Sequence, residues 1–221
     1  MFKAIKAVIF DLDGLLIDSE ASYRSAWQQA LTQMGYCLDK AFFDELVGAD
    51  ASRVERLLTN QLDSRFDLAV FRRLSAECWY AQLNRAGMPV MPGVSSILAA
   101  CKRLAWPTVV ATNSEYVQAI KLLELAGLSA EFTQVLARDQ VANPKPAPDI
   151  YLLAAEYLSL KPAECLVLED SLTGITAALA AQMPCCWISA ATHAAPAYWS
   201  ENCLVLPDLH ELAARIEVLS V

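Results

Sequence analysis

Short apolar runs that end in polar residues recur along the chain. Each run holds three or four residues, is rich in β-branched or large apolar side chains, and lacks an exposed polar face. This pattern is typical of strands that are buried on both faces in a parallel sheet. The predicted strands are Ala7–Phe10, Thr108–Ala111, Cys165–Leu168, Cys185–Ile188 and Leu204–Leu206.

Segments with helical periodicity lie between these runs. They are Val94–Leu104, Tyr116–Ala126, Pro148–Leu158, Leu172–Gln182 and Leu209–Leu219. Alternation of strands and helices predicts an α/β fold with a doubly wound, Rossmann-like parallel sheet. Ligands of such sheets bind at the carboxyl ends of the strands. The polar residues that end the runs are therefore expected to converge in space.

The segment 18–88 breaks the alternation. Its apolar residues follow helical spacing only, over Tyr23–Met34, Ala41–Val47, Ser52–Gln61 and Leu68–Asn84. A stretch rich in Pro and Gly, Gly87–Gly93, is typical of a return linker. The pattern predicts an α/β core made of 1–17 and 89–221, with a helical domain, 18–88, inserted after the first strand. A helical domain hinged at such a place can open and close on a substrate.

Composition narrows the classes of function. The 221 residues are 56% hydrophobic and carry a net charge of −8, which disfavours general binding to nucleic acid or to anionic membranes. Seven cysteines without a CxxC pair, and only two histidines, argue against zinc and favour reduced thiols in a cytoplasmic protein. No signal peptide and no membrane-spanning run is expected. A monomer is the default expectation.

Polar clusters follow the first two strands. Asp11 and Asp13, beside Gly14, could bind a metal or exchange protons, although Asp and Gly also favour ordinary turns. The cluster Thr112-Asn113-Ser114 stands before a helix and could bind an anion. A helix N-cap accounts for its serine equally well.

Two further clusters complete the set. Lys145 stands between prolines in Asn143–Pro148, and could supply a fixed positive charge to a phosphate rather than a merely solvated one. Glu169 and Asp170 follow an apolar strand and suit a hard cation with oxygen ligands, whereas Asp170 or Ser171 could also serve as an N-cap. Four such clusters at four strand ends are better explained by one shared site than by four independent structural roles.

The motifs DLDG, TNS, KPAPD and LEDS, in this order and spacing, resemble those of the haloacid dehalogenase-like hydrolase superfamily. They extend over the whole core, from Ala7 to about Ala180. The phosphatase branch with a helical cap after the first strand is the most similar. Asp18-Ser19-Glu20 and Leu172–Ile175 also resemble the subgroup of β-phosphoglucomutases, phosphoglycolate phosphatases and sugar-phosphate phosphatases.

The resemblance implies a role for each motif. Asp11 would be the nucleophile that forms an aspartyl-phosphate, and Asp13 the general acid and base. Thr112 and Asn113 would bind phosphate oxygens, and Lys145 would bridge the nucleophile and the phosphate. The physics agrees, because a cation must cancel the repulsion between a carboxylate and a phosphate dianion.

The same resemblance implies Mg²⁺ as the cofactor. Asp170, assisted by Glu169, would bind it together with the Asp11 carboxylate and the Asp13 carbonyl. The expected activity is hydrolysis of a small phosphorylated metabolite, with a sugar phosphate preferred. Whether Glu169 contacts the metal directly is left open at this point.

Residues of the helical segment are expected to choose the substrate. The candidates are Glu20 in the first linker, Gly48 at the start of a loop, and Arg53. Arg53 could also be a solvated helix charge. Further positions of interest are Tyr23, Trp27 and Asp50. Tyr23 and Trp27 are four residues apart and could instead pack the core of the helical segment.

Rival functions differ at specific residues. β-Phosphoglucomutases carry histidine where Tyr23 aligns, and Lys and Arg around the loop glycine, where this chain has Val47 and Asp50-Ala51; a mutase is therefore the alternative rather than the first choice. Dehalogenases lack the equivalents of Asp13 and Asp170. Phosphonatases use a lysine of the cap, for which Lys40 is the candidate, without further support. A non-catalytic regulator that binds sugar phosphates is the remaining alternative.

Overall fold

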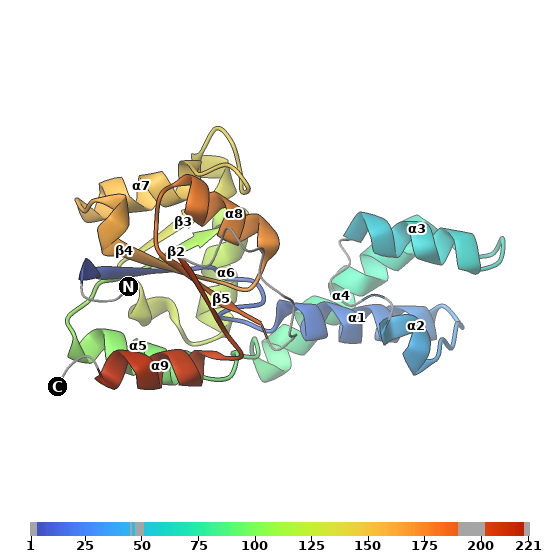
Figure 1. The fold of residues 1–221 in the computed structure, drawn as a ribbon. Coiled ribbons are helices and arrows are strands. Elements are labelled where there is room, and N and C mark those ends of the chain that lie inside the picture. Colours follow the sequence, from blue (N-terminus) through green and yellow to red (C-terminus); the bar gives the residue numbers. More distant parts are fainter. Residues whose placement is uncertain (1–3, 45, 47–50, 190–201, 219–221) are drawn as a thin grey trace. The chain divides into compact units, whose positions relative to one another are not determined.

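A computed structural model describes residues 4–44, 46, 51–189 and 202–218. The chain divides into two compact units (Figure 1): an α/β unit, Met1–Ile17 with Val90–Val221, and a helical unit, Asp18–Pro89. The sequence-based boundary at the return linker lies one residue earlier, because it assigned Pro89 to the core.

The α/β unit contains a parallel sheet with the strand order β3-β2-β1-β4-β5-β6. This confirms the predicted doubly wound α/β fold. The strands are β1 (Ala7–Phe10), β2 (Thr108–Thr112), β3 (Gln134–Ala137), β4 (Cys165–Glu169), β5 (Cys185–Ile188) and β6 (Cys203–Leu206). Every residue of β1, β2 and β4 is buried, as expected for central strands covered on both faces.

Helices cover both faces of this sheet. They are α5 (Val94–Arg103), α6 (Tyr116–Leu125), α7 (Asp149–Leu158), α8 (Leu172–Ala180) and α9 (Leu209–Val218). Helices α7 and α8 lie on one face, and α5 and α9 lie on the other (Figure 1). Short 3-10 turns occur at Ser129–Glu131, Arg138–Gln140 and Pro162–Glu164.

Strand β3 was missed by the sequence analysis. It pairs with β2 at one edge of the sheet, with Thr112 opposite Ala137. Its first residue, Gln134, is polar and only half-buried, so the apolar run is three residues long and gives little signal. After β3 and a 3-10 turn, the chain enters the loop that carries Lys145.

The strand order places a switch point beside β1. From β1 the chain builds β2 and β3 on one side of β1, then returns to build β4 on the other. Phe10 lies opposite both Val110 and Leu168, so the carboxyl ends of three central strands lie at one level. Ligands of open α/β sheets bind in the crevice at such a point.

The helical unit contains α1 (Ser19–Gln33), α2 (Lys40–Asp44), α3 (Ala51–Gln61) and α4 (Leu68–Ala86). Helix α1 begins four residues before the predicted start, because the Asp18 carboxylate accepts a hydrogen bond from Ala21 N and caps the helix. Helices α1 and α4 pack against each other. The described residues of this unit form no strand.

Several aromatic side chains of this unit stack on one another. Tyr23 stacks on Trp79, with ring centroids 4.7 Å apart, and on Trp27 at 6.1 Å. The buried indole N–H of Trp79 donates to Ser22 Oγ over 2.8 Å. The alternative that Tyr23 and Trp27 pack this unit therefore agrees with the structure. Among the described residues, no helix combines the length and apolar character that crossing a membrane requires.

Candidate active site

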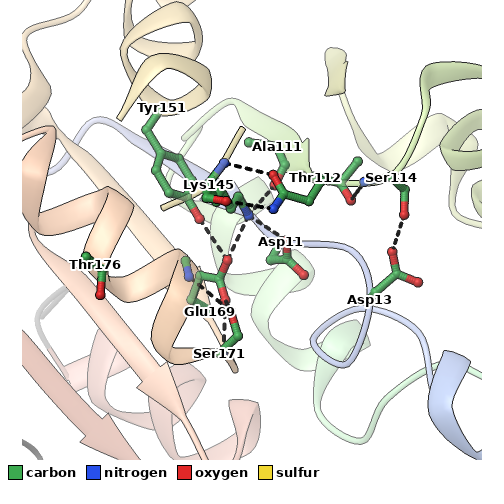
Figure 2. A network of polar contacts seen from close by, with 12 residues as sticks. Asp11, Asp13, Ala111, Thr112, Ser114, Lys145, Tyr151, Glu169, Ser171 and Thr176 are labelled. Carbon is green, nitrogen blue, oxygen red and sulfur yellow. Dashed lines mark hydrogen bonds and ion pairs between the residues drawn. The ribbon is translucent and has the colours of Figure 1, made fainter. Parts of the chain in front are cut away.

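Lys145 is the centre of a buried polar network at the carboxyl ends of β1, β2 and β4 (Figure 2). Its ammonium donates to Asp11 Oδ1 over 2.6 Å, to Glu169 Oε1 over 2.7 Å and to the Ala111 carbonyl over 2.8 Å. Three donors therefore meet three acceptors. Burial alone lowers the pKa of Lys145, but the negative charges of Asp11 and Glu169 outweigh it and raise that pKa, so the group stays an ammonium.

The loop that carries Lys145 is fixed by Asn113. The Asn113 side chain accepts a hydrogen bond from Lys145 N over 3.0 Å and donates to the Lys145 carbonyl over 3.2 Å. This reciprocal pair joins the end of β2 to the loop before α7. The side-chain amide of Asn113 is thus engaged with the backbone, which the sequence analysis did not foresee.

Asp11 is a buried carboxylate at the end of β1. Its backbone N–H continues the sheet by donating to the Leu168 carbonyl over 3.0 Å. Burial raises the pKa of Asp11 well above its ordinary value; Lys145 opposes this rise, whereas the charges of Glu169 and Asp170 add to it. Positive charge beside Asp11 therefore favours its ionised form, whereas the neighbouring carboxylates disfavour it.

Asp13 lies beside the network rather than within it (Figure 2). Its Oδ2 accepts a hydrogen bond from Ser114 Oγ over 2.7 Å. Ser114 was a candidate N-cap, but the N-cap of α6 is Glu115. Ser114 N donates to Thr112 Oγ1 over 3.0 Å, so one short turn positions both a threonine hydroxyl and the partner of Asp13.

Glu169 is almost completely buried, and protein donors surround it. Its Oε1 accepts from Lys145 and from the Tyr151 hydroxyl, the latter over 3.0 Å. Its Oε2 accepts from the backbone N–H and the hydroxyl of Ser171, over 3.0 and 2.9 Å. Ser171 also caps α8, because Gly174 N donates to its hydroxyl. Ser171 therefore both caps α8 and donates to Glu169 in the site.

Asp170 faces the same cavity. Burial raises the pKa of Asp170 to about 7, with a further contribution from the charge of Glu169. The close approach of Asp170 depends on Gly14, because a Cβ at that position would lie 2.1 Å from Asp170 Oδ2. The glycine of the DLDG motif thus makes room for a carboxylate from a neighbouring strand.

The donor set suits a hard divalent cation. Carboxylate oxygens of Asp11, Glu169 and Asp170 all lie within 4.8 Å of one another. With Lys145 as the only cation in contact among the described residues, these four groups carry a formal charge of −2. All the available ligand atoms are oxygens, which Mg²⁺ prefers.

A cavity of about 250 Å³ connects these groups. It is lined by Asp11, Asp13, Thr112, Asn113, Ser114, Lys145, Glu169, Asp170, Ser171 and Thr173. All seven core residues that the sequence analysis selected are therefore brought together. Three lining residues were not selected, namely Ser114, Ser171 and Thr173. They stand in the motifs TNS and LEDS and in the stretch Leu172–Ile175, but none of them was assigned a role in the site.

The candidate substrate contacts of the helical segment are either exposed or outside the described residues. Glu20 is exposed in the first turn of α1, and Arg53 is exposed on α3. Gly48 and Asp50 lie outside the described residues. Their expected roles in substrate choice stay predictions.

Comparison with known proteins agrees with these motifs. The family model for haloacid dehalogenase-like hydrolases matches residues 5–182. The chain belongs to this family. It is 33% identical to the fructose-1-phosphate phosphatase YqaB of Escherichia coli K12 over 183 residues, which is 83% of this chain and 96% of the relative. It is 29% identical over 180 residues to the phosphorylated carbohydrates phosphatase of Thermotoga maritima, covering 80% and 82% of the two chains.

A solved structure extends the likeness to three dimensions. The haloacid dehalogenase family hydrolase from Deinococcus radiodurans R1, determined with bound phosphate and sodium, superposes with a TM-score of 0.79 at 30% identity. The match covers 97% of this chain and 96% of that one. The family assignment made from the four motifs is thus confirmed.

Proposed function

We propose that this haloacid dehalogenase-like hydrolase is a Mg²⁺-dependent phosphatase that acts on a small phosphorylated metabolite, with a sugar phosphate preferred. The observation that carries the proposal is the contact of the Lys145 ammonium with Asp11 Oδ1 in a cavity whose carboxylates outnumber its single lysine. The names of the two phosphatase relatives, which refer to fructose 1-phosphate and to phosphorylated carbohydrates, support the substrate class.

In the proposed reaction, Asp11 attacks phosphorus and the alkoxide leaves. Asp13 protonates that alkoxide and then accepts a proton from the water that hydrolyses the aspartyl-phosphate, which restores Asp11 and releases phosphate. Dividing hydrolysis into two displacements is the usual benefit of a covalent carboxylate. Because Ser114 donates to Oδ2 of Asp13, Oδ1 is the oxygen we assign to proton transfer.

The other groups of the cavity hold the phosphate and the nucleophile. Lys145 keeps Asp11 oriented and contributes positive charge, and the Thr112 hydroxyl can donate to a phosphate oxygen while it accepts from Ser114 N. Since the Asn113 side chain is engaged with the Lys145 backbone, we assign phosphate contact to the backbone N–H of Asn113.

Asp11 and Asp170 are the residues proposed to hold Mg²⁺ directly, with the Asp13 carbonyl and with Glu169 close by. A bound Mg²⁺ would supply charge that stabilises the transferring phosphate oxygens. The site in this structure carries an excess of negative charge that such an ion would neutralise.

The helical unit would act as a cap that chooses the substrate, with Glu20, Gly48 and Arg53 as candidate contacts. All seven cysteines are free thiols, which supports a cytoplasmic location with a reducing environment. A monomer stays the expected state in solution.

The first experiment is hydrolysis of p-nitrophenyl phosphate with and without Mg²⁺, in the wild type and in Asp11→Asn. Asp208→Asn is the matched control, since Asp208 caps α9 outside the cavity and asparagine can replace it as a cap. We expect activity that depends on Mg²⁺, loss of it in Asp11→Asn, and retention in Asp208→Asn. Full activity of Asp11→Asn would contradict the mechanism.

A second experiment identifies the substrate and separates the rival functions. A panel of about a hundred phosphorylated metabolites is scored by released phosphate, which measures discrimination between related substrates. Conversion of β-glucose 1-phosphate into glucose 6-phosphate, rather than release of phosphate, would favour the mutase. Binding of a sugar phosphate without turnover of any substrate would favour the regulator.

A further inference from the structure

Tyr151 is a fully buried residue of α7 that contacts two groups of the active site (Figure 2). Its hydroxyl donates to Glu169 Oε1 over 3.0 Å. Its ring lies under the Lys145 ammonium, with Nζ 4.8 Å from the ring centroid. It does not line the cavity and has no part in the proposed reaction.

These contacts come from a separate element. Lys145 stands in the loop before α7, Glu169 ends β4, and Asp11 follows β1. Tyr151 is the residue of α7 that contacts both Lys145 and Glu169. A cation over an aromatic face is attracted by the ring quadrupole, most strongly where water is excluded.

The network gives this connection a specific consequence. All three N–H groups of Lys145 are used, and Glu169 Oε1 is one of their three acceptors. If Oε1 moves, the ammonium must turn, and its 2.6 Å contact with Asp11 changes with it. The Tyr151 hydroxyl is the second donor to that oxygen and so restricts its movement.

We propose that Tyr151 is a positioning residue of the active site, which fixes the Lys145 ammonium against Asp11 by holding Glu169 Oε1 with its hydroxyl and supporting Nζ with its ring. The inference rests on the proposed function only for its effect on catalysis. The arrangement itself concerns Lys145, Glu169 and Tyr151 and can be tested without substrate.

The alternative is that the hydroxyl merely satisfies itself in the core, as buried tyrosines usually do. Tyr157 offers a matched control on the same helix. Its exposed hydroxyl donates to the Thr133 carbonyl over 3.2 Å, which does not belong to the Lys145 network. Tyr151→Phe and Tyr157→Phe each remove one hydroxyl and keep the ring.

Steady-state kinetics with p-nitrophenyl phosphate and Mg²⁺ form the first measurement, with the folded fraction checked by circular dichroism. We expect kcat of Tyr151→Phe to fall about 10- to 150-fold, the range for loss of one hydrogen bond to a charged group, with KM within about twofold. Tyr157→Phe should match the wild type. A purely structural hydroxyl would lower thermal stability and leave kcat of the folded enzyme unchanged.

The second measurement is the ¹⁵N NMR signal of the Lys145 ammonium in the protein without substrate, assigned by its absence in Lys145→Arg. In the wild type we expect a protected, slowly exchanging signal, and in Tyr151→Phe at least a fivefold faster hydrogen exchange. Tyr157→Phe should leave it unchanged.

The two measurements separate the possible failures. Wild-type kcat or an unchanged Lys145 signal in Tyr151→Phe would overturn the positioning role, because the hydroxyl would then not act through Lys145. A wild type that hydrolyses no phosphate ester, combined with the expected change of the Lys145 signal, would overturn the proposed function and support the positioning role.

Discussion

Both units have ion pairs on their surfaces, but among the described residues only the α/β unit also buries charged side chains. In the α/β unit, the side chains of Lys145, Asp11 and Glu169 form ion pairs while only 2%, 11% and 1% exposed. In the helical unit, Arg72 pairs with Glu55 at 61% and 22% exposure. The polar residues buried in the described part of the helical unit are serines.

The difference shows which unit includes the unfavourable free energy of burying charged groups. Removing an ion from water costs several kcal/mol, which pairing does little more than offset, so buried ion pairs are weak stabilisers of a fold. The α/β unit accepts this cost at the carboxyl ends of its strands, where a buried charge can act on a substrate. The ion pairs described in the helical unit are exposed to water, and its core combines aliphatic and aromatic side chains. Substitutions should therefore affect catalysis in one unit and mainly stability in the other.

Lys145→Met gives the largest expected contrast, with Arg72→Met as its counterpart. Without Lys145, Asp11 and Glu169 lose their cation in a buried site, so we expect about 3–5 kcal/mol of lost stability. We also expect activity to fall about 100- to 1,000-fold, since a fixed charge beside the nucleophile is removed. Arg72→Met should change little, because exposed pairs are screened by water.

Urea denaturation and p-nitrophenyl phosphate hydrolysis measure both effects. Equal losses of stability in the two variants would break the comparison, since burial would then not determine the contribution of a charge. Loss of activity in Arg72→Met at wild-type stability would show that the helical unit holds a catalytic charge.

Gly174→Ala tests how tightly the buried site is packed. A Cβ at Gly174 would lie 1.6 Å from Glu169 Oε1, so the glutamate would have to leave its partners. We expect an activity loss of about 10- to 100-fold from the disturbed bonds to this charged group. Gly35→Ala is the control, because its φ of +84° strains an alanine but no atom lies near the added Cβ.

Activity per folded molecule and the unfolding midpoint are compared in both variants. Gly35→Ala should lose about 1 kcal/mol of stability through backbone strain and keep its kcat. Wild-type kcat in Gly174→Ala would mean that Glu169 can relocate without consequence, which would contradict its place in the network.

Most of the sheet, and the convergence of the polar motifs at one edge of it, could be predicted from the sequence for a physical reason. Central parallel strands are apolar on both faces, and their carboxyl ends lie at one edge, so residues far apart in the chain could be expected to meet. The edge strand β3 escaped because Gln134 shortens its apolar run. The order of the motifs also identified the family, which the family model confirms.

Other parts of the site could not be predicted. Tyr151 stands among apolar helix residues, and nothing in that pattern distinguishes a tyrosine that contacts Glu169 from one that packs the core. The contact of Ser114 with Asp13 depends on the conformation of one turn after β2, which residue types alone do not specify. The roles of Glu20, Gly48 and Arg53 depend on the substrate and stay predictions.

Ser114→Ala sharpens the comparison within the α/β unit. Removal of the hydroxyl leaves the Asp13 carboxylate without its 2.7 Å partner, so its orientation toward the leaving group is less restricted. One hydrogen bond of about 1 kcal/mol corresponds to a roughly fivefold fall in kcat. Ser96→Ala, which removes an exposed hydroxyl near His210, is the control and should keep its kcat. An unchanged kcat in Ser114→Ala would exclude a positioning role for this serine.

Trp79→Phe has the smallest expected effect on activity and tests the helical unit directly. The substitution removes the buried N–H that donates to Ser22 Oγ and keeps an aromatic ring against Tyr23. We expect about 1–2 kcal/mol of lost stability from the unpaired hydroxyl, measured by urea denaturation. The kcat for p-nitrophenyl phosphate should stay within about twofold of the wild type, because no charge of the catalytic network is touched and the loss belongs to one buried hydrogen bond. Tyr80→Phe, an exposed neighbour, is the control for both readouts. A fall in kcat as large as that of Ser114→Ala, with Tyr80→Phe unchanged, would show that the packing of the helical unit is coupled to catalysis. Substitutions in the helical unit would then no longer affect stability alone.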